Sequence, residues 1–238
     1  MSPVSCLTPP GGGTLCAVER HLLHRYGSKD GALAYRHKYE RTLSRRLSNR
    51  RELAIVDRTL LEAGVHGRVL DCPCGAGRLT PTILGHAEHV TAVDLSAAMV
   101  AEAKDALAPL LAGGGLDFAV ASVDDLPFAE KHFDAAVCHR LIHHIADPMA
   151  RAKVFAELAR VTKERVVMSF SDATTIKHRL QSRRGRKRRR VAFEPDRLRE
   201  EAAAEGLVLR GVPQRLNGLF SLVAVTVFDV VRKASDVA

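Results

Sequence analysis

Two carboxylates and a glycine turn are the residues of this chain best suited to hold a small ligand. Asp71 ends an apolar run, and Gly75 and Gly77 lie in the turn that follows it. Glycine lets a ligand approach the main chain where a side chain would collide with it. Asp94 ends the next apolar run, where a carboxylate can accept hydrogen bonds from both hydroxyls of a ribose. The pattern therefore predicts a nucleotide-like ligand.

Histidines after a later apolar run could move a proton. His139 and His143 follow residues 133–138, and the unperturbed pKa of histidine, about 6.5, lies close to neutral pH. Either ring could therefore act as a general base on a bound substrate. Arg140 lies between the two histidines and predicts a cationic contact with that substrate.

A parallel sheet would bring these residues together. The apolar run before Asp71 suits a strand buried on both faces, and residues 79–84 are predicted as the helix after the turn. Strand, glycine turn and helix in that order form the mononucleotide-binding half of a doubly wound α/β fold, with the ligand at the carboxyl end of the strand. Further strands are predicted at 89–94, 116–121, 133–138, 166–170, 207–212 and 219–231, and helices at 148–161 and 194–205.

Three parts are predicted along the chain. Residues 1–15 contain two prolines followed by three glycines and are expected to form a disordered tail. Residues 16–63 have a helical pattern, broken near 27–30, and form an N-terminal helical cap. Residues 64–238 form the ligand-binding domain, with a basic insertion at 177–190.

Two tyrosines of the cap are candidate substrate contacts. Ser28 or Asp30 could cap the second helix of this region. Tyr35 and Tyr39 lie four positions apart, which would place both on one face of that helix. Such a face could form a lid over the ligand, since a phenol suits a wet pocket edge. Packing against the domain would explain the same spacing, so both interpretations stay open.

The composition predicts a globular protein in the cytoplasm. Its 238 residues are 46% hydrophobic and 26% charged, which is ordinary for a folded domain long enough to bury a core. We find neither a long apolar run nor the pattern of a signal peptide. The five cysteines are odd in number and argue against a disulfide framework. Cys72 and Cys74 lack a second ligand pair, so structural thiols are expected and no metal site is predicted.

The net charge of the chain is concentrated in one segment. Residues 177–190 hold nine Lys or Arg and no acid, which equals the net charge of the whole chain, +9. Like charges this dense repel one another, which favours a polyanionic partner over a solvated loop. That partner would be an anionic membrane surface, making the protein peripheral to the inner membrane face, or RNA; DNA is not expected, and the oligomeric state is not indicated. The predicted contacts are Arg183, Arg184, Arg186, Lys187, Arg188, Arg189 and Arg190.

Three segments resemble the class I S-adenosylmethionine-dependent methyltransferases, most closely their ubiquinone-biosynthesis-like, type 11 group. D-x-x-C-G-x-G at 71–77 resembles motif I, residues 121–128 resemble the adenine loop G-D-A-E-D-L-P-F, and residues 133–144 resemble F-D-x-V-x-x-x-x-x-L-H-H. The resemblance implies that Asp71, Gly75 and Gly77 hold the methionine part of the cofactor, that Asp94 holds its ribose, and that Leu95, Ser122, Val123, Asp124 and Cys138 complete the cofactor site.

The chain departs from this family at several positions. Ser122 stands where relatives carry the acid that receives the adenine amino group, so Asp124 could take over part of that role. His139 and Arg140 replace small or apolar residues. Residues 162–165 replace the usual Lys-Pro-Gly-Gly turn and would form a shorter turn. His144 lies on a face that relatives use for packing, which makes His139 and His143 the better base candidates.

The resemblance implies a Rossmann-like, doubly wound, seven-stranded, mostly parallel sheet with an antiparallel last strand. It also implies methyl transfer from S-adenosylmethionine. The N-P-P-[YF] tetrapeptide of amino-methylating nucleic-acid enzymes is absent, and residues 138–141 stand in its place. An oxygen or carbon atom of a small or lipid-like acceptor is therefore expected. The alternatives are an RNA methyltransferase that uses residues 183–190, a dinucleotide-dependent oxidoreductase, and a non-catalytic cofactor-binding module.

Overall fold

A computed structural model describes residues 27–39, 42–176, 178, 180, 191–219 and 223–231, with only the backbone of Tyr39 and residues 216–219. The predicted tail and the basic residues 183–190 lie outside this described part.

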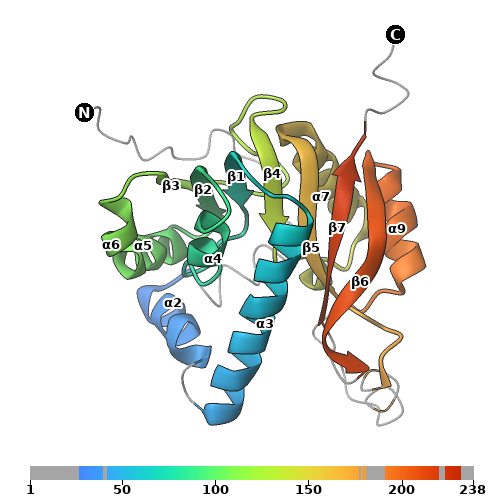
Figure 1. The fold of residues 1–238 in the computed structure, drawn as a ribbon, viewed down its shortest axis with the longest axis horizontal. Coiled ribbons are helices and arrows are strands. Elements are labelled where there is room, and N and C mark those ends of the chain that lie inside the picture. The colour runs from blue at the N-terminus through green and yellow to red at the C-terminus, as the bar shows by residue number, and fades with distance from the viewer. Residues whose placement is uncertain are drawn as a thin grey trace.

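Seven strands form one sheet in the order β3-β2-β1-β4-β5-β7-β6 (Figure 1). β7 runs antiparallel to both of its neighbours, and the pairs among β1 to β5 are parallel. This confirms the predicted fold class. The strand order reverses between β1 and β4, and in such sheets ligands bind at the carboxyl ends beside this point. The strands are β1 Arg68–Asp71, β2 His89–Asp94, β3 Leu116–Val120, β4 Phe133–Cys138, β5 Thr162–Ser171, β6 Leu207–Leu219 and β7 Val223–Val230.

Helices cover both faces of the sheet (Figure 1). Side chains of α3, α4 and α5 pack on one face, and those of α7 and α9 pack on the other. The described helices are α2 Lys29–Arg36, α3 Leu43–Glu62, α4 Thr80–Leu84, α5 Ala97–Ala106, α6 Ala108–Leu111, α7 Pro148–Val161 and α9 Pro195–Ala203, with 3-10 turns η1 His37–Tyr39 and η2 Ile142–His144. None of the helices in the described part of the chain is both long and apolar enough to span a bilayer.

Alternate residues of the central strands build two cores. Val69 of β1 packs with the helices α3 to α5, and its neighbour Leu70 packs with α7 and α9. Ala135 and Ala136 of β4 divide in the same way. Because successive side chains point to opposite faces, a strand covered on both sides reads as one continuous apolar run. These central strands hold the ends that carry the predicted site residues.

The N-terminal cap differs from the single second helix that the sequence predicts. Ser28 caps α2 by accepting a hydrogen bond from the Gly31 N–H, as expected. The helix then gives way to η1, and Thr42 starts α3 by accepting a hydrogen bond from the Arg45 N–H. An N-cap at this position favours a new helix over continuation of the old one. Tyr35 therefore lies on α2 and Tyr39 on η1, so they do not share a helix face.

Two strands extend further than predicted. Residues 162–165, expected as a turn, belong to β5, where Thr162 pairs with Phe133 and a bulge follows. β6 continues to Leu219, with a register shift between Arg210 and Gln214. A bulge breaks the alternation of side chains along a strand. The sequence pattern therefore did not predict that β5 starts at Thr162 or that β6 continues to Leu219.

Candidate functional site

A pocket opens at the carboxyl ends of β1, β2, β3 and β4, with α2 and η1 beside it. Its wall includes most of the predicted ligand residues, which come from five separate segments of the chain: Tyr35, Asp71, Gly75, Asp94, Leu95, Ser122, Val123, His139 and Arg140. Lys38, Arg78 and His144 also line it. Gly77, Asp124, Cys138 and His143 do not belong to this wall.

Asp71 is a buried acid with one of its two oxygens hydrogen-bonded in the described part of the chain. Its Oδ2 accepts a hydrogen bond from the Thr80 hydroxyl at 2.7 Å. Its Oδ1 has no hydrogen-bond partner among the described residues. Burial, aided by the nearby Asp94, raises the pKa of Asp71 to about 7, against the lowering effects of the Thr80 hydrogen bond and the charge of Arg78. A cation that paired with Oδ1 would stabilise the ionised carboxylate.

Asp94 holds the glycine turn as well as facing the pocket. Its two oxygens accept hydrogen bonds from the Gly75 and Ser96 N–H groups, each at 2.9 Å. Burial raises its pKa to about 6, although these two backbone hydrogen bonds lower it. Ser96 also caps α5 by accepting a hydrogen bond from the Met99 N–H. The carboxylate thus fixes the turn after β1 and the start of the helix after β2, a positioning role that the spacing alone did not reveal.

Gly77 lies where a side chain would collide with its neighbours. Its φ is +75°, and a Cβ built there would lie 2.8 Å from Leu107 Cδ1 and 3.2 Å from the Ala103 Cβ. Both neighbours belong to the buried cluster on the α5 side of the sheet. Gly75 also has positive φ, +55°, but a Cβ there would meet only the Tyr35 ring at 3.5 Å. Close approach of the α5 region thus gives a packing reason for glycine at 77, and contact of Gly77 with a ligand stays a prediction.

We expect Gly77→Ala to lower the free energy of unfolding by about 2 to 5 kcal/mol, because backbone strain and overpacking add. Gly114→Ala is the matched control, since Gly114 has φ +73° and nothing within 4 Å of its built Cβ. The control should lose only the strain contribution, about 1 to 2 kcal/mol. Urea unfolding of the three proteins measures both values. Equal losses in the two variants would contradict the packing role.

Some residues of the predicted adenine loop line the pocket, and another contacts a lining residue from outside the lining. Ser122 and Val123 line the pocket, and the Ser122 hydroxyl donates a short hydrogen bond to the Asp124 carboxylate. Asp124 thus acts on the pocket through Ser122. Cys138 lies in the core on the α7 and α9 side. Burial raises its pKa to about 12, and Cys72, Cys74 and Cys138 are free buried thiols.

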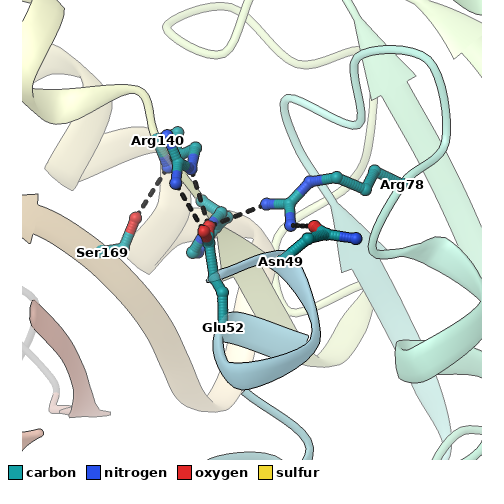
Figure 2. A network of polar contacts seen from close by, with 6 residues as sticks. Asn49, Glu52, Arg78, Arg140 and Ser169 are labelled. Atoms are coloured by element: carbon teal, nitrogen blue, oxygen red, sulfur yellow. Dashed lines mark hydrogen bonds and ion pairs between the residues drawn. The ribbon is translucent and has the colours of Figure 1, made fainter. Parts of the chain in front are cut away.

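Glu52 of α3 joins both sides of the pocket (Figure 2). Its Oε1 accepts hydrogen bonds from Arg78 Nη2 at 2.8 Å, Arg140 Nε at 2.7 Å and His139 Nε2 at 2.6 Å. Its Oε2 accepts a further one from Arg140 Nη2 at 2.5 Å. The Oδ1 of Asn49, one turn earlier, accepts from Arg78 Nη1 at 2.7 Å. The side chain of Glu52 is 1% exposed, so one buried carboxylate links the loops after β1 and β4.

The charges around Glu52 set its ionisation and that of His139. Burial alone would raise the pKa of Glu52, but hydrogen bonds from His139 and Arg140 and the charges of Arg140 and Arg78 hold it well below its usual range. Burial lowers the pKa of His139 to about 4, and contact with Glu52 does not compensate. Glu52 is therefore an anion and His139 is neutral at pH 7. Because a carboxylate only accepts, the His139 proton must lie on Nε2.

The other two histidines occupy different environments. His143 is fully buried, and its ring lies 4.4 Å from that of His144 between centroids. His144 lines the pocket although the sequence ranked it below His143. The 3-10 turn η2 explains this difference, since consecutive residues of such a turn point in different directions.

Glu52, Arg78 and Asn49 are the site residues that reading of the sequence missed. A signal for Glu52 existed, because positions 52, 56 and 60 share one face of a helix. Val56 and Leu60 are apolar and buried there, as is Glu52. An acid on an otherwise apolar helix face needs a buried partner. This pattern could have identified Glu52 as a residue with such a partner.

Part of the chain is similar in sequence to known methyltransferases. Residues 69–165 match the model of a family described as a methyltransferase domain. The chain is similar to the ubiquinone biosynthesis O-methyltransferase of Hahella chejuensis, with 33% identity over 105 residues, 44% of this chain and 42% of that protein. The enzyme of the same name from Xanthomonas axonopodis is 36% identical over 94 residues, which make up 39% of this chain and 38% of that protein. The match thus spans about two fifths of the length of these relatives.

Solved structures share the fold at low identity. Magnesium protoporphyrin IX methyltransferase from Synechocystis with bound S-adenosylhomocysteine has a TM-score of 0.72 at 17% identity, covering 89% of this chain and 99% of that one. An S-adenosylmethionine-dependent methyltransferase from Clostridium acetobutylicum has a TM-score of 0.67 at 15% identity, with coverages of 84% and 99%. Residues 69–165 of this chain thus match a methyltransferase-domain family, and the described part of the chain has the fold of these solved S-adenosylmethionine-dependent methyltransferases.

Proposed function

We propose that this protein transfers the methyl group of S-adenosylmethionine to an oxygen or carbon atom of a small or lipid-like acceptor. The observation that carries the proposal is one pocket that joins the buried acids Asp71 and Asp94 to the loop after β4. The similarity to relatives named O-methyltransferases favours oxygen as the accepting atom.

The residues present fit this cofactor. The Oδ1 of Asp71, which has no hydrogen-bond partner among the described residues, suits the ammonium group of its methionine part, because a buried carboxylate oxygen needs a donor or a cation. Asp94 suits the ribose hydroxyls, since each carboxylate oxygen can accept more than the one backbone hydrogen bond that it has. Ser122 and Val123 would lie along the adenine.

Positioning explains how such a site would accelerate the reaction. When bound, S-adenosylmethionine supplies an electrophilic methyl group on a sulfonium sulfur. Holding an acceptor in line with that carbon removes most of the entropic cost of a two-molecule reaction. Asp94 would fix the turn at Gly75, and Glu52 would fix the loop at His139 and Arg140. These contacts would hold the two halves of the pocket in constant relative positions.

The test uses methyl-labelled S-adenosylmethionine and a small-molecule extract of cells. We expect mass spectrometry to find a labelled product that requires the protein, and calorimetry to show binding of S-adenosylhomocysteine but not of NAD. Binding without any labelled product would instead favour the non-catalytic cofactor-binding module. NAD binding without a response to S-adenosylhomocysteine would refute the proposal.

His139 is the better placed of the two predicted bases. It lines the pocket, and with Nε2–H donated to Glu52 its Nδ1 is the nitrogen that would accept a proton. His139→Gln keeps a donor for Glu52 and removes the base. Because a pKa of about 4 makes the ring a weak base at neutral pH, we expect turnover to fall only about tenfold, with cofactor affinity unchanged. Steady-state kinetics of His139→Gln beside the wild type measures this, and unchanged turnover would exclude a base at this position.

A polyanionic partner for residues 183–190 stays a proposal from the sequence alone. An anionic membrane would contribute roughly 1 kcal/mol per basic residue, which would hold the enzyme near a lipid-linked acceptor. RNA binding would weaken with salt at a log-log slope of about −0.7 per phosphate neutralised. We expect a variant with these seven basic residues changed to Gln to lose sedimentation with anionic vesicles. An RNA filter-binding titration tests the alternative. If the variant behaves as the wild type does in both assays, the segment has no polyanionic partner and is only a solvated loop.

A further inference from the structure

The outward face of α3 carries a line of exposed apolar side chains. Leu43, Leu47 and Leu61 are 81%, 49% and 69% exposed, and Ala54 is exposed as well. Positions 43 and 61 lie about five helical turns apart on one side of the helix, and positions 47 and 54 fall within about a quarter turn of the line that joins them. These four residues therefore form one stripe along the helix, which we call the outer stripe.

The outer stripe lies opposite the face of α3 that packs on the sheet. Val56 and Leu60 on that inner face belong to the buried cluster shared with β1 and β2, and Glu52 is buried on the same face. In Figure 1 no described element lies over the outer side of α3. A surface helix normally turns polar residues to solvent. Several exposed apolar side chains in one line, unlike single ones, therefore point to an interaction surface.

Two opposite charges flank the outer stripe at nearly equal distances from Ala54. Arg50 lies four positions before Ala54 and Asp57 lies three positions after it, and both are exposed. These offsets are about 6 Å and 4.5 Å along the helix axis, and the two residues differ by only about 20° around it. A two-fold axis beside Ala54, perpendicular to α3, would therefore place Arg50 of one copy opposite Asp57 of the other. Asp57 also pairs with His86 of its own copy at 2.8 Å.

The same axis also matches the apolar side chains. Leu47 lies seven positions before Ala54 and Leu61 seven positions after it, so Leu47 of one copy would meet Leu61 of the other. Ala54 would meet its own copy, and a small side chain at the point of contact lets two helices approach closely. A surface hollow beside Ala54 gives room for the Arg50 side chain of the other copy to reach Asp57. This hollow is lined by Leu53, Ala54, Asp57, Pro81, Thr82 and Gly85.

We propose that α3 forms the interface of a two-fold symmetric homodimer, in which the outer stripes of two copies pack antiparallel around Ala54. A two-fold interface uses the same patch of both copies, so the patch must be complementary to itself. The outer stripe meets this requirement, because reversal about Ala54 exchanges Leu47 with Leu61. The same reversal brings Arg50 to Asp57, so each apolar contact and each charge pair forms twice.

Sedimentation velocity of the 238-residue chain over a concentration series tests the dimer and its register. The wild type should dimerise, and Leu61→Asp should abolish the dimer. Arg50→Asp or Asp57→Arg alone places like charges opposite each other and should weaken dimerisation about tenfold or more. The double variant R50D/D57R restores opposite charges and should dimerise nearly as the wild type does. Asp196→Arg is the control, since Asp196 is an acid of α9 that is 82% exposed, and it should change nothing.

A cysteine at position 54 tests the place of the axis. Ala54→Cys is made together with Cys6→Ser and Cys16→Ser, because Cys72, Cys74 and Cys138 are buried. Copper phenanthroline and oxygen should join the new thiols of two copies in a disulfide, since residues at a two-fold axis meet their own copies. Asp196→Cys in the same background should not cross-link.

Three results would each overturn the inference. The first is a monomer at every concentration. The second is a dimer that Leu61→Asp leaves intact, or one that the double charge reversal does not restore after the single changes weaken it. The third is a dimer in which Ala54→Cys cross-links no better than Asp196→Cys, because its two-fold axis would then lie elsewhere.

Discussion

Replacing Asp71 with Asn is expected to weaken the binding of S-adenosylhomocysteine about a hundredfold. The Asp71 carboxylate is buried, and its Oδ1 has no hydrogen-bond partner in the described part of the chain. A charge-assisted hydrogen bond from the ligand ammonium to this oxygen is worth about 1.5 to 3 kcal/mol. Asparagine removes the negative charge but keeps the size and an acceptor for Thr80, so the change reports on charge.

The same variant should lose most of the pH dependence of binding. Burial raises the pKa of Asp71 to about 7 and that of Asp94 to about 6. The ammonium pairs with the ionised carboxylate, whereas protonated Asp71 offers it no charge. Affinity in the wild type should therefore rise with pH, by up to about tenfold per unit below pH 7, and level off above it. The variant should keep only the weaker dependence due to Asp94.

Isothermal titration calorimetry from pH 5.5 to 8 measures both effects. The matched control is Asp117→Asn, because Asp117 is an exposed acid on β3 that pairs with His89 at 3.0 Å and does not line the pocket. It should bind S-adenosylhomocysteine as the wild type does. If Asp71→Asn shows wild-type affinity and the wild-type pH profile, Asp71 does not meet the ligand.

Local sequence signals were enough to predict the central strands and the positions of their carboxyl ends. The bounds of β2 and β4 and the helix α7 agree with the sequence prediction. Each is either a short run of apolar residues buried on both faces or a helix started by an Asp-Pro pair, and both patterns depend on neighbours in sequence. Because parallel strands meet at one edge, the prediction also placed Asp71, Asp94 and His139 at one pocket.

Contacts between distant segments could not be predicted in the same way. Glu52 lies 26 residues from Arg78 and 88 from Arg140, and only the packing of α3 brings them together. The role of Gly77 depends likewise on Leu107 of the segment that follows α5. Spacing identifies which residues follow a strand, but it does not identify which helix covers them. The sequence therefore predicted His139 and Arg140 as pocket residues without the acid that holds them.

Replacing Glu52 with Ala should lower the free energy of unfolding by about 3 to 5 kcal/mol, because it leaves two arginines and a histidine around an empty, buried position. Glu62→Ala is the matched control on the same helix, since Glu62 is 46% exposed and pairs with Arg58, and it should cost at most about 1 kcal/mol.

The difference between wild type and Glu52→Ala should also shrink as the pH falls. The folded-state pKa of Glu52 lies well below its unfolded value, so its stabilising effect is full above about pH 5. The effect is then lost by about 1.4 kcal/mol per unit below about pH 4, where the unfolded state takes up the proton first. Urea unfolding at pH 7, 4 and 3 measures this. A loss below 1 kcal/mol at pH 7, or a loss that grows in acid, would contradict this prediction. Either result would show that the negative charge of Glu52 is not what holds Arg78, Arg140 and His139 in the pocket wall. The network would then contribute little to folding.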